Sequence, residues 1–525
     1  MKTIVVPVDG ASNIKLEVLD FDSLSTIFSH TGETPVSEDG GLEYNCTREE
    51  CSWFDSVIRE LPHGIKHVKV IAPVARGASG GLIGPDNTLI EAPGKGLTLA
   101  YTQKYPERVE NVFRELAGDA YDFFRDTGSI RDFPGSLTLI KRFLFEEMER
   151  PELVDRAECF ATYGILLSGH FLGDDYLGAV HTAGNEHSYW MCHTGARNIN
   201  EKPGTPSSVS GKIASFRKLV PRECYPVYKP IGTVPCEQVS RLGLSGDIMV
   251  IPGGHDTCLS HIPIMSTYYQ AFDERSGTPV IHVEAGSWTM VAQIGGIVRL
   301  PPDAYKRDII VQGTVDGQPV VTARYGGGND FRHVKRLVEE RGFRFECACS
   351  EQLLLEVLRE SGCFVLPNIS PVNYQSGPFP GLQGRIINEH VFFRNSERAF
   401  VITGLTTAIT TAVQVDALAQ AEDIPLVLTA GGSRDPWFGR LLAALTGRTV
   451  YGMYDSNGNA VSETTTLGAA IVGKAACVNV HPYLVDVSGI GVTYHKLEPF
   501  DTEIERYLSS YREQLMLEIK NHSNS

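Results

Sequence analysis

Residues 243–257 read GLSGDIMVIPGGHDT. Glycine and polar residues open this stretch and predict a loop, the apolar run after them predicts a buried strand, and the Gly253-Gly254 pair predicts a turn. An aspartate that follows such a turn, just past a buried strand, is well placed to point into a cleft, so Asp256 is a candidate functional carboxylate. We place the main domain boundary in this stretch, after Ser245.

The length and composition of the chain limit what it can be. A chain of 525 residues is too long for one core and predicts two large or three small domains. Hydrophobic residues make up 42% and charged residues 21%, as in ordinary globular proteins. The net charge is -16 and no basic run stands out, which argues against a nucleic-acid partner.

The cysteines and the apolar segments bear on the compartment. Eleven cysteines are scattered along the chain, and the close pairs Cys46/Cys51 and Cys347/Cys349 lack a second pair at zinc-finger spacing. Free thiols in a reducing compartment are the simpler interpretation. The first residues, MKTIVVPVDG, lack the features of a signal peptide, and no apolar run reaches about 18 residues. We expect a soluble, cytoplasmic protein with no membrane partner.

The first half of the chain opens with a predicted hairpin. Residues 3–8 are rich in β-branched side chains, and the small polar turn GASN at residues 10–13 separates them from the apolar alternation of residues 15–20. Residues 68–74 form another apolar run, and residues 106–169 show mostly helical spacing. Because the first turn is small, its backbone can approach a ligand.

The second half opens with two predicted strands, residues 280–283 and 289–294, around Gly286-Ser287. Residues 425–428 predict a strand that runs directly into Gly431-Gly432-Ser433. Helices are predicted at residues 401–418, 436–445, 462–476 and 502–520. Each half thus starts with a strand and a glycine-rich turn, but no repeat of residue identity supports a duplication.

Two motifs carry candidate chemistry and also have plain structural explanations. Phosphoryl transfer to a hydroxyl needs a carboxylate that orients the hydroxyl and takes its proton, which Asp256 can supply. The alternative is that Asp256 caps the next helix. The GSWT turn at residues 286–289 can bind phosphate oxygens through N–H and O–H donors, or it is an ordinary hairpin turn.

Two further motifs are weaker. The Gly431-Gly432 pair at a strand end lets the backbone lie against a nucleotide, or it is a routine strand-to-helix turn. The segment from Asp9 to Lys15 fits a phosphate-binding hairpin, or it is a surface hairpin with a solvated Lys15. It is not a P-loop, because the spaced Gly-Lys-Ser/Thr signature is missing, and no Gly-x-Gly-x-x-Gly follows a strand as in dinucleotide-binding oxidoreductases.

The order and spacing of the motifs resemble the FGGY carbohydrate kinases of the actin-like ATPase class. The series runs DGASN, RGASGG, GGHDT, GSWT, AGGS and SETTTLGAA, from about Val5 to about Lys474. The His-Asp-Thr form looks most like the rhamnulokinase and fuculokinase branch, and NEHSYWMCHT at residues 185–194 resembles a stretch in some of its members.

This resemblance implies an α/β fold of two actin-like (ribonuclease H-like) domains around a central cleft, each with a mixed five-stranded sheet. Residues 1–245 would bind the sugar and residues 246–525 would bind ATP. Asp256 would be the general base of a sugar kinase, and ATP and Mg²⁺ would be the cofactors. The sugar-binding residues would be Arg76, Gly77, His255, Asp256 and Thr257. The ATP-binding residues would be Ala11, Ser12, Asn13, Lys15, Ser287, Thr289, Gly431 and Gly432, and Tyr325–Asn329 (YGGGN) would line the cleft.

One position departs from the family pattern. The family places an aspartate that helps to hold Mg²⁺ two residues before the glycine of the first turn, where this chain has Val8. The carboxylate follows one residue later, at Asp9. Because side chains alternate faces along a strand, this shift turns the carboxylate to the other side unless a bulge restores it. Asp9 is therefore a metal-ligand candidate whose reach to the metal is open.

The choice of substrate class rests only on the resemblance to the carbohydrate kinases. Residues 76–81 lack the Gln-Met-His type signature of xylulokinases and the Arg-Glu pair of glycerol kinases. A ketopentose or a 6-deoxyketohexose is the expected small-molecule partner, and a homodimer is left open. The alternatives are a non-catalytic sugar- or nucleotide-binding regulator on the same fold, which the shifted Asp9 supports, and a kinase for a polyol or a signal molecule.

Overall fold

The computed structural model describes residues 1–10, 13–92, 94–133, 135–190, 194–202, 204–272, 277–296, 300–345, 350–371, 377–418, 423–461 and 463–523. Its contacts divide the chain into two compact units. The first unit holds residues 1–273, 311–320 and 463–491, and the second holds residues 274–310, 321–462 and 492–525. Residues 246–273, which follow the boundary predicted from the sequence, thus lie in the first unit.

The first unit is built on a mixed sheet that starts from the predicted hairpin. Its strands are β1 (Thr3–Asp9), β2 (Asn13–Asp20), β3 (Thr26–Glu33), β6 (Val68–Ile71), β7 (Val74–Ala75), β13 (Gly232–Thr233), β14 (Met249–Val250) and β15 (Gly254–His255). The order is β13-β14-β6-β1-β2-β3, and β7 joins β1 to β15. β1 pairs antiparallel with β2 and parallel with β6, which confirms the hairpin at the start of the chain.

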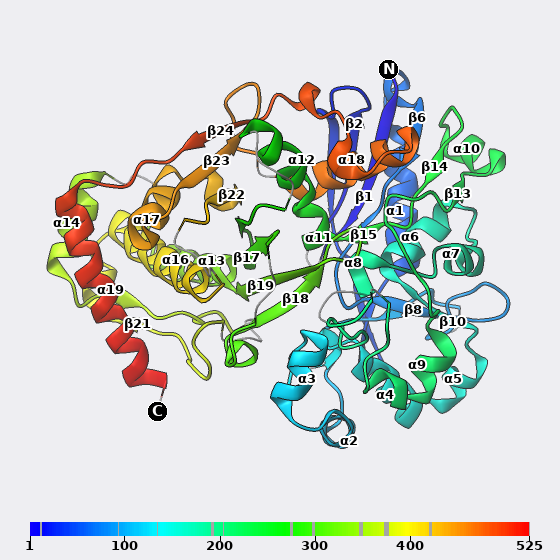
Figure 1. Ribbon diagram of the computed structural model, residues 1–525, viewed down its shortest axis with the longest axis horizontal. Coiled ribbons are helices and arrows are strands. Elements are labelled where there is room, and N and C mark those ends of the chain that lie inside the picture. The colour runs from blue at the N-terminus through cyan, green and yellow to red at the C-terminus, as the bar shows by residue number, and fades with distance from the viewer. Residues whose placement is uncertain are drawn as a thin grey trace. The chain divides into compact units, whose positions relative to one another are not determined.

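The helices of the first unit pack against this sheet and around a second apolar core. They are α1 (Thr47–Glu60), α2 (Glu107–Ala117), α3 (Ala120–Thr127), α4 (Ile140–Glu149), α5 (Pro151–Arg156), α6 (Tyr163–Phe171), α7 (Tyr176–Ala183), α8 (His187–Trp190), α9 (Ala214–Leu219), α10 (Cys236–Leu242), α11 (Asp256–Ser260), α12 (Ile262–Ala271) and α18 (Thr464–Val478). Val5 of β1 belongs to one core cluster with Phe54 of α1, whereas its neighbour Ile4 lies beside Gly473 of α18. Alternate side chains of β1 therefore pack against different helices. α18, orange in Figure 1, lies against the blue β1, although the two are far apart in the sequence.

Short strands complete the first unit. They are β4 (Val36–Asp39), β5 (Leu42–Asn45), β8 (Gly80–Ile83), β9 (Thr98–Leu99), β10 (Cys159–Thr162), β11 (Asn185–Glu186) and β12 (Cys224–Tyr225). A turn at residues 85–87 follows β8, since the backbone N–H of Gly84 donates to the carbonyl of Thr88. β10 interrupts the segment that the sequence indicated as mostly helical, because its four residues are buried by pairing with β8.

The second unit repeats the topology of the first. Its sheet and short strands are β16 (Val280–Ala285), β17 (Thr289–Ile294), β18 (Ile309–Gly313), β19 (Pro319–Tyr325), β20 (Phe364–Val365), β21 (Ile386–Ile387), β22 (Leu426–Ala430), β23 (Val450–Tyr454) and β24 (Thr493–Lys496). The end of β18 and the start of β19 belong to residues 311–320, which are counted with the first unit. β16 pairs antiparallel with β17, β17 pairs antiparallel with β19, and β16, β22 and β23 run parallel. In the first unit, β1 likewise pairs antiparallel with β2, β2 pairs antiparallel with β3, and β1, β6 and β14 run parallel. The duplication that residue identity did not support is therefore present in the strand order.

The prediction of five strands in each sheet is too low. Among the described residues, the first sheet has eight strands and the second has seven, in the order β18-β19-β17-β16-β22-β23-β24. Five strands make the common centre of each sheet, and the rest are edge strands or two-residue segments that carry no clear alternation in the sequence.

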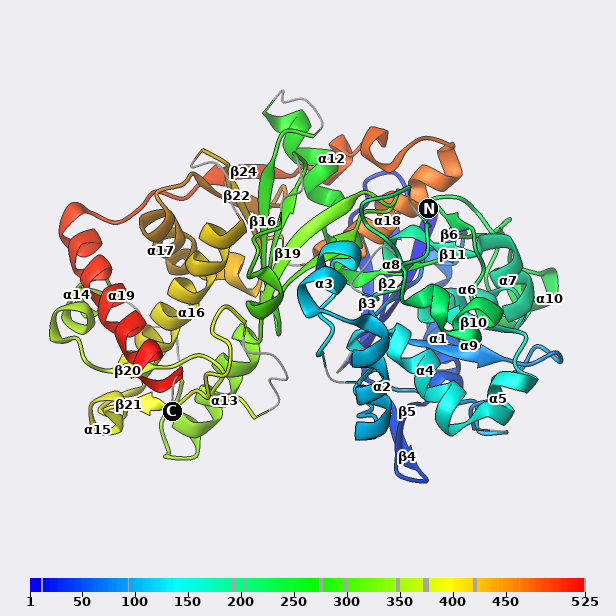
Figure 2. The same cartoon turned by 60° about the horizontal axis from the view of Figure 1, so that its bottom comes forward.

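The helices of the second unit are α13 (Gly327–Glu339), α14 (Glu351–Glu360), α15 (Glu389–Phe392), α16 (Ser396–Leu418), α17 (Pro436–Thr446) and α19 (Thr502–Ser523). They confirm the predicted helices at 401–418, 436–445 and 502–520. α16 and α17 lie next to one another beside the sheet (Figure 2). α16 is the one helix of the described residues whose length and hydropathy would suffice to cross a membrane, and most of it is buried inside its own unit, as in a core helix.

Candidate active site

Asp256 lies where the GGHDT segment leaves the sheet. β15 ends at His255, which is the N-cap residue of α11, and Asp256 is the first residue of that helix. Oδ1 of Asp256 accepts a hydrogen bond from the backbone N–H of Thr257 at 2.7 Å and lies 3.2 Å from Nε2 of His255. Oδ2 has no partner among the described residues, and 39% of the side chain is exposed. One carboxylate oxygen is therefore anchored, and the other is open.

His255 is held from its backbone and from its ring. Its backbone N–H donates to Oγ of Ser188 at 2.9 Å, and Nδ1 lies 3.2 Å from Sγ of Cys258. Ser188 donates in turn to Oε2 of Glu186 at 2.6 Å. Glu186 and Ser188 are buried and belong to the NEHSYWMCHT segment. Sequence reasoning noticed that segment as a resemblance but missed its role, which is to support His255.

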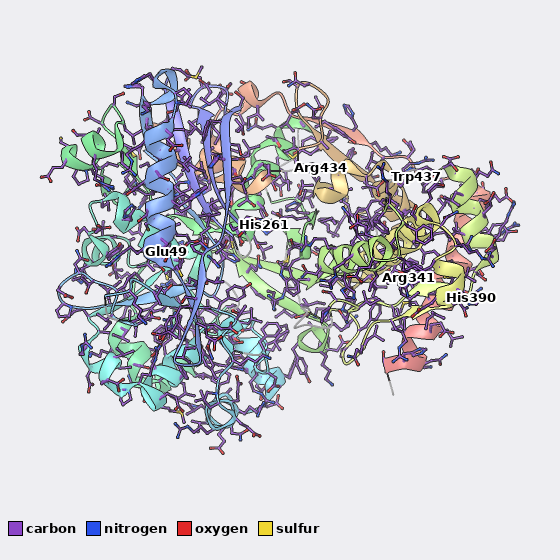
Figure 3. All side chains as sticks on the ribbon, turned by 180° about the vertical axis from the view of Figure 1, so that it is seen from behind. Glu49, His261, Arg341, His390, Arg434 and Trp437 are labelled. Atoms are coloured by element: carbon purple, nitrogen blue, oxygen red, sulfur yellow. The ribbon has the colours of Figure 1, made fainter. Side chains whose placement is uncertain are left out.

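A second histidine lies behind the first. Complete burial, with a smaller contribution from the nearby His255, lowers the pKa of His261 to about 3. His261, labelled in Figure 3, is therefore neutral at any physiological pH and adds no positive charge next to Asp256.

Two glycines make room for this arrangement. A Cβ on Gly77 would lie 2.3 Å from Nε2 of His255, because β7, which ends two residues before Gly77, runs parallel to β15. Gly253 has a φ of +76° and faces the backbone of Gly164 at 3.1 Å, so a side chain there would be both strained and crowded. Gly77 is half-buried beside His255, and its contact with a sugar through the backbone stays a prediction.

Arg76 and Asp9 form a buried ion pair. Nε of Arg76 donates to Oδ2 of Asp9 at 2.8 Å, a second guanidinium nitrogen donates to Oδ1, and the backbone N–H of Arg76 lies 3.4 Å from Oδ2. The guanidinium also reaches Oε1 of Glu50 at 3.1 Å and Oδ1 of Asn45 at 3.3 Å. Asp9 is 0% exposed and Arg76 is 4% exposed. Arg76, predicted to contact the sugar, thus directs its guanidinium into the unit.

The surroundings of this pair are strongly charged. Burial alone would lower the pKa of Arg76, but the carboxylate of Asp9 outweighs burial and raises it. Burial, and then the negative charge of Asp9, raise the pKa of Glu50 well above its ordinary value. The hydroxyl of Tyr163 donates to Oε2 of Glu50, and its ring lies under the guanidinium at 5.4 Å.

The first turn carries the other predicted phosphate contacts of this unit. Ala11 and Ser12 lie outside the described residues. The backbone N–H of Gly10 donates to the carbonyl of Asn13 at 3.1 Å, and Asn13 is exposed. Nζ of Lys15 lies 2.6 Å from Oε2 of Glu463 and 3.1 Å from Oε1 of Glu17. Burial would lower the pKa of Lys15, but these two carboxylates raise it, so Lys15 is a cation that is already paired.

The described residues do not fit a magnesium site at the end of β1. Mg²⁺ is usually bound through one or two carboxylates together with substrate phosphates. Val8 occupies the family's ligand position, and both oxygens of Asp9 are taken by Arg76. Across the part of the chain that the structure describes, no group of three or more His, Cys, Asp or Glu side chains is placed to hold a metal ion.

In the second unit, the GSWT turn packs against the start of α13. The backbone N–H of Gly286 donates to the carbonyl of Trp288 at 3.2 Å, which closes the hairpin between β16 and β17. A Cβ on Gly328 would lie 2.1 Å from the carbonyl oxygen of Gly286, and a Cβ on Gly327 would lie 2.5 Å from Oγ1 of Thr289. The YGGGN segment, predicted to line the cleft, thus meets the turn backbone to backbone. Ser287 is exposed, whereas Thr289 is buried.

The AGGS turn lies beside the same hairpin. β22 runs parallel to β16, with Ala430 opposite Ala285, so both strands end at one edge of the sheet. A Cβ on Gly431 would lie 3.0 Å from the carbonyl oxygen of Ala285, and a Cβ on Gly432 would lie 2.7 Å from Cβ of Ala285. After this turn Asp435 caps α17 by accepting from the backbone N–H of Trp437 at 2.9 Å, where Figure 3 marks Trp437 and Arg434. Three glycine-rich segments therefore converge at one sheet edge, as a nucleotide site requires.

Arg332 is a candidate that sequence reasoning missed. It is exposed on the second turn of α13, and one guanidinium nitrogen donates to Oγ of Ser287 at 3.0 Å while another donates to Oδ1 of Asn329. The signal was present three residues after the YGGGN segment, because helical spacing places residues 329 and 332 on one face. Arg332 is thus a cation that touches a predicted phosphate contact.

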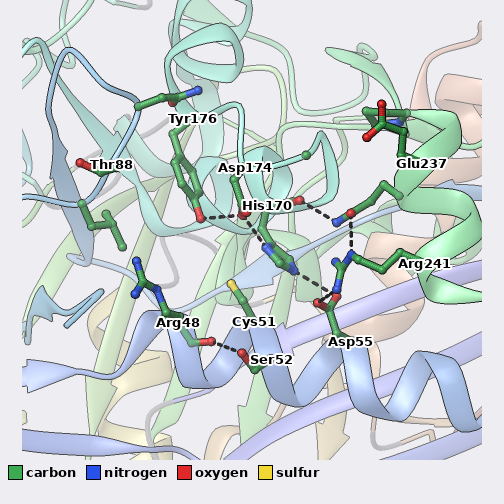
Figure 4. A pocket seen from close by; sticks show the side chains of 15 residues that line it. Arg48, Cys51, Ser52, Asp55, Thr88, His170, Asp174, Tyr176, Glu237 and Arg241 are labelled. Carbon is green, nitrogen blue, oxygen red and sulfur yellow. Dashed lines mark hydrogen bonds and ion pairs between the residues drawn. The ribbon is translucent and has the colours of Figure 1, made fainter. Parts of the chain in front are cut away.

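A separate cavity of about 590 Å³ lies in the first unit, over α1 (Figure 4). His170 forms its floor, with Nε2 at 3.0 Å from Oδ1 of Asp55 and Nδ1 at 2.8 Å from Oδ1 of Asp174. Asp55 also accepts from Arg241 at 2.6 Å. None of the predicted site residues lines this cavity.

Comparison with known proteins finds a family similarity in the second half of the chain. Residues 277–478 match the carbohydrate kinase FGGY C-terminal domain. The β16-β17 hairpin, β22 and α17, which hold the glycine-rich segments just described, all lie within the matched residues. No curated protein matches the sequence.

Solved structures of several kinases are similar to the chain over nearly its whole length, which confirms the predicted α/β fold class. A carbohydrate kinase from Novosphingobium aromaticivorans has a TM-score of 0.74 at 21% identity, with 99% of both chains covered. A ligand-bound xylulose kinase from Lactobacillus acidophilus has a TM-score of 0.74 at 15% identity, covering 99% of this chain and 98% of that one. Plasmodium falciparum glycerol kinase with ADP has a TM-score of 0.71 at 13% identity, with 98% of both chains covered.

The FGGY match and the structures together support the carbohydrate kinase class predicted from the sequence motifs. They bear on the class and on the fold. The roles of Asp256, His255, Thr257, Ser287, Gly431 and the other predicted site residues, and the rhamnulokinase or fuculokinase branch, stay predictions.

Proposed function

We propose that this chain is an ATP-dependent kinase for a hydroxyl of a small ketose, with Asp256 as the general base. The observation that carries the proposal is the carboxylate of Asp256, whose Oδ1 is anchored by Thr257 and lies close to His255 while Oδ2 is open. A base held in this way can take the proton of an attacking hydroxyl without losing its orientation. The FGGY match over residues 277–478 supports the kinase class.

The proposed reaction is a direct transfer. The acceptor oxygen attacks the γ-phosphorus of ATP, its proton passes to Asp256, and ADP leaves. Gly77, His255 and Thr257 form the acceptor side. On the nucleotide side, the backbone of Gly431 and Gly432 and the donors of Ser287 and Thr289 hold ATP, to which Arg332 adds a positive charge. ATP enters as its magnesium complex, and no step is assigned to a protein-bound metal.

The acceptor class rests on the motifs. The His-Asp-Thr form of residues 255–257 supports a ketopentose or a 6-deoxyketohexose, and the fold shared with a xylulose kinase agrees with a ketose. A polyol or a signal molecule is the alternative acceptor.

The paired state of Asp9 favours a second candidate, a sugar- or nucleotide-binding regulator that no longer transfers phosphate. The carboxylate expected at the metal is absent from residue 8, and the next one is neutralised by Arg76. This candidate predicts binding of ATP or sugar without turnover.

The experiment is coupled ADP release with Mg-ATP against a panel of ketoses, 6-deoxyketoses and polyols. Acceptor-dependent turnover with one best substrate supports the kinase and names its acceptor. Calorimetric binding of ATP and sugar without any acceptor-dependent ADP release would instead support the regulator.

A further inference from the structure

We propose that Asp9 is not a metal ligand in this chain but the counter-ion of Arg76, and that this pair positions the strand end at Gly77 against His255 and Asp256. Asp9, Glu50 and Arg76 are then positioning residues of the acceptor side. The proposal rests on the proposed function, because Asp256 is taken as the base.

The shifted carboxylate at the end of β1 is matched by a buried cation. The carboxylate at the end of β1 is shifted by one residue, and because strand side chains alternate, Asp9 points to the face opposite to Val8. On that face it meets Arg76, which is 67 residues away in sequence. The contact is bidentate, with Nε at 2.8 Å from Oδ2 and the terminal nitrogen on Oδ1. A fork of this kind fixes orientation as well as charge.

The guanidinium is largely engaged inside the unit, because four of its five N–H groups donate to Asp9, Glu50 and Asn45. Its remaining contacts are Glu50 at 3.1 Å and Asn45 at 3.3 Å, and its flat face lies over the ring of Tyr163. With 4% of Arg76 exposed, a ligand would have to break an ion pair to reach it. Arg76 is therefore a fixed part of the frame, and it acts on the acceptor side through its backbone.

A short path leads from the pair to the base. β7 pairs with β1 on one side, through Val74 and Val8, and with β15 on the other, through Ala75 and His255. Arg76 follows β7 directly, and Gly77 comes next, against the imidazole of His255. Nε2 of His255 lies 3.2 Å from Oδ1 of Asp256. A displacement of Arg76 is transmitted to Asp256 through one glycine and one buried histidine.

The network is anchored on α1 as well. Glu50 lies in the first turn of α1 and accepts from Tyr163, whose hydroxyl also lies 3.2 Å from Oγ1 of Thr47. Thr47 in turn lies 2.9 Å from Oγ1 of Thr98. Because these groups come from separate segments of the first unit, the position of Arg76 is set by several elements at once.

The test compares Asp9→Asn, Arg76→Gln and the double variant in the full-length protein. A metal-ligand role for Asp9 and a counter-ion role predict opposite patterns. If Asp9 is the counter-ion, both single variants weaken acceptor binding by about tenfold to a hundredfold, and the double variant is no worse than either. The magnesium concentration for half-maximal activity then changes by less than about twofold. A rise in the magnesium requirement in Asp9→Asn but not in Arg76→Gln overturns the proposal.

Two further measurements separate positioning from general destabilisation. Arg76→Lys keeps the positive charge and loses the two-pronged contact with Asp9. Compared with Arg76→Gln, we expect it to restore the free energy of unfolding but to restore kcat only in part. Recovery of kcat and acceptor KM together by Arg76→Lys overturns the positioning role. Folding of every variant is checked by urea unfolding, and only the native fraction is compared.

The counter-ion role of Asp9 can also be tested without any kinase activity. Mn²⁺ titration followed by electron paramagnetic resonance, with and without ATP, reports metal binding without turnover. Equal Mn²⁺ affinity in wild type and Asp9→Asn supports the counter-ion role, whereas a clear loss in Asp9→Asn overturns it. Absence of ADP release in the wild type counts only against the proposed kinase.

Discussion

Nε2 of His255 lies 3.2 Å from Oδ1 of Asp256, and the same imidazole would be only 2.3 Å from a Cβ on Gly77. One buried ring thus touches the proposed base on one side and the strand end of the acceptor side on the other. Ser188 accepts from the backbone N–H of His255 and Cys258 contacts its ring, so the direction of the Asp256 carboxylate depends on the residues that support His255. Four predictions follow from this geometry and from its counterparts elsewhere in the chain.

Replacing Asp256 by Asn removes the base and keeps the shape of the side chain. We expect kcat to fall by about 10²- to 10⁴-fold, while the dissociation constant of the acceptor, measured by calorimetry, changes little. Asp247→Asn is the matched control, because Asp247 is exposed in the preceding loop. Near-normal turnover in Asp256→Asn would remove Asp256 from the mechanism.

Replacing Gly77 by Ala places a methyl group against the buried imidazole of His255. Since that ring is packed on all sides, the strand end must move, and we expect a loss of acceptor binding of at least about tenfold together with lower kcat. Gly64→Ala is the control, because a Cβ there meets nothing within 4 Å. Steady-state kinetics of both variants checks this, and unchanged kinetics in Gly77→Ala would contradict the close approach.

Replacing Gly328 by Ala drives a methyl group into the carbonyl of Gly286, 2.1 Å away. The GSWT turn and the start of α13 must then separate, so we expect ATP binding measured by calorimetry to weaken and the free energy of unfolding to fall. Gly404→Ala, inside α16 with nothing within 4 Å, should instead stabilise the protein by about 0.5–1 kcal/mol. Equal ATP affinity in Gly328→Ala and wild type would exclude this turn from the nucleotide site.

His170 should make stability depend on pH in the alkaline range. Burial would lower its pKa, but the bonds to Asp174 and Asp55 raise it from 6.5 to about 9. The folded protein therefore holds this proton more tightly than the unfolded chain, so the stabilisation is complete below about pH 6.5 and is lost as pH rises through 9. The full shift corresponds to about 3 kcal/mol, and exposure of Asp174 reduces it.

Urea unfolding between pH 6.5 and 9 measures this loss. His170→Gln cannot take up a proton, so its free energy of unfolding should be lower than that of wild type at the acid end and should depend less on pH. His63→Gln, at an exposed position, is the control and should follow the wild type. A wild-type stability that stays constant over this range would contradict the prediction.

Much of the fold could be read from short stretches of sequence. The β-branched run at residues 3–8 and the alternation at 15–20 predicted β1 and β2, because the period of two is a local property. The GG turns before Asp256 and after Thr429 were placed correctly for the same reason. The two-residue strands β7 and β15 could not be predicted, since pairing, not composition, creates them.

The positions of single site residues could be predicted from the sequence, but the contacts between them could not. The sequence placed Asp256, Ser287 and Gly431 at strand ends, where the structure has them. It could not show that Ser188 supports His255 or that Arg332 touches Ser287, because neither pair falls within one periodic element. The one-residue shift at Asp9 was visible, but its consequence was not.

The sequence by itself determined much of the secondary structure of this protein, because hydrophobic periodicity, turn glycines and helix caps act over a few neighbouring residues. The strands, the glycine-rich turns and the motif order all belong to this level. Only the tertiary structure decided two ion pairs, that of Asp9 with Arg76 and that of Lys15 with Glu463, which lie 448 residues apart. They arise only when the sheet brings distant strand ends together and burial makes an unpaired charge too costly to keep.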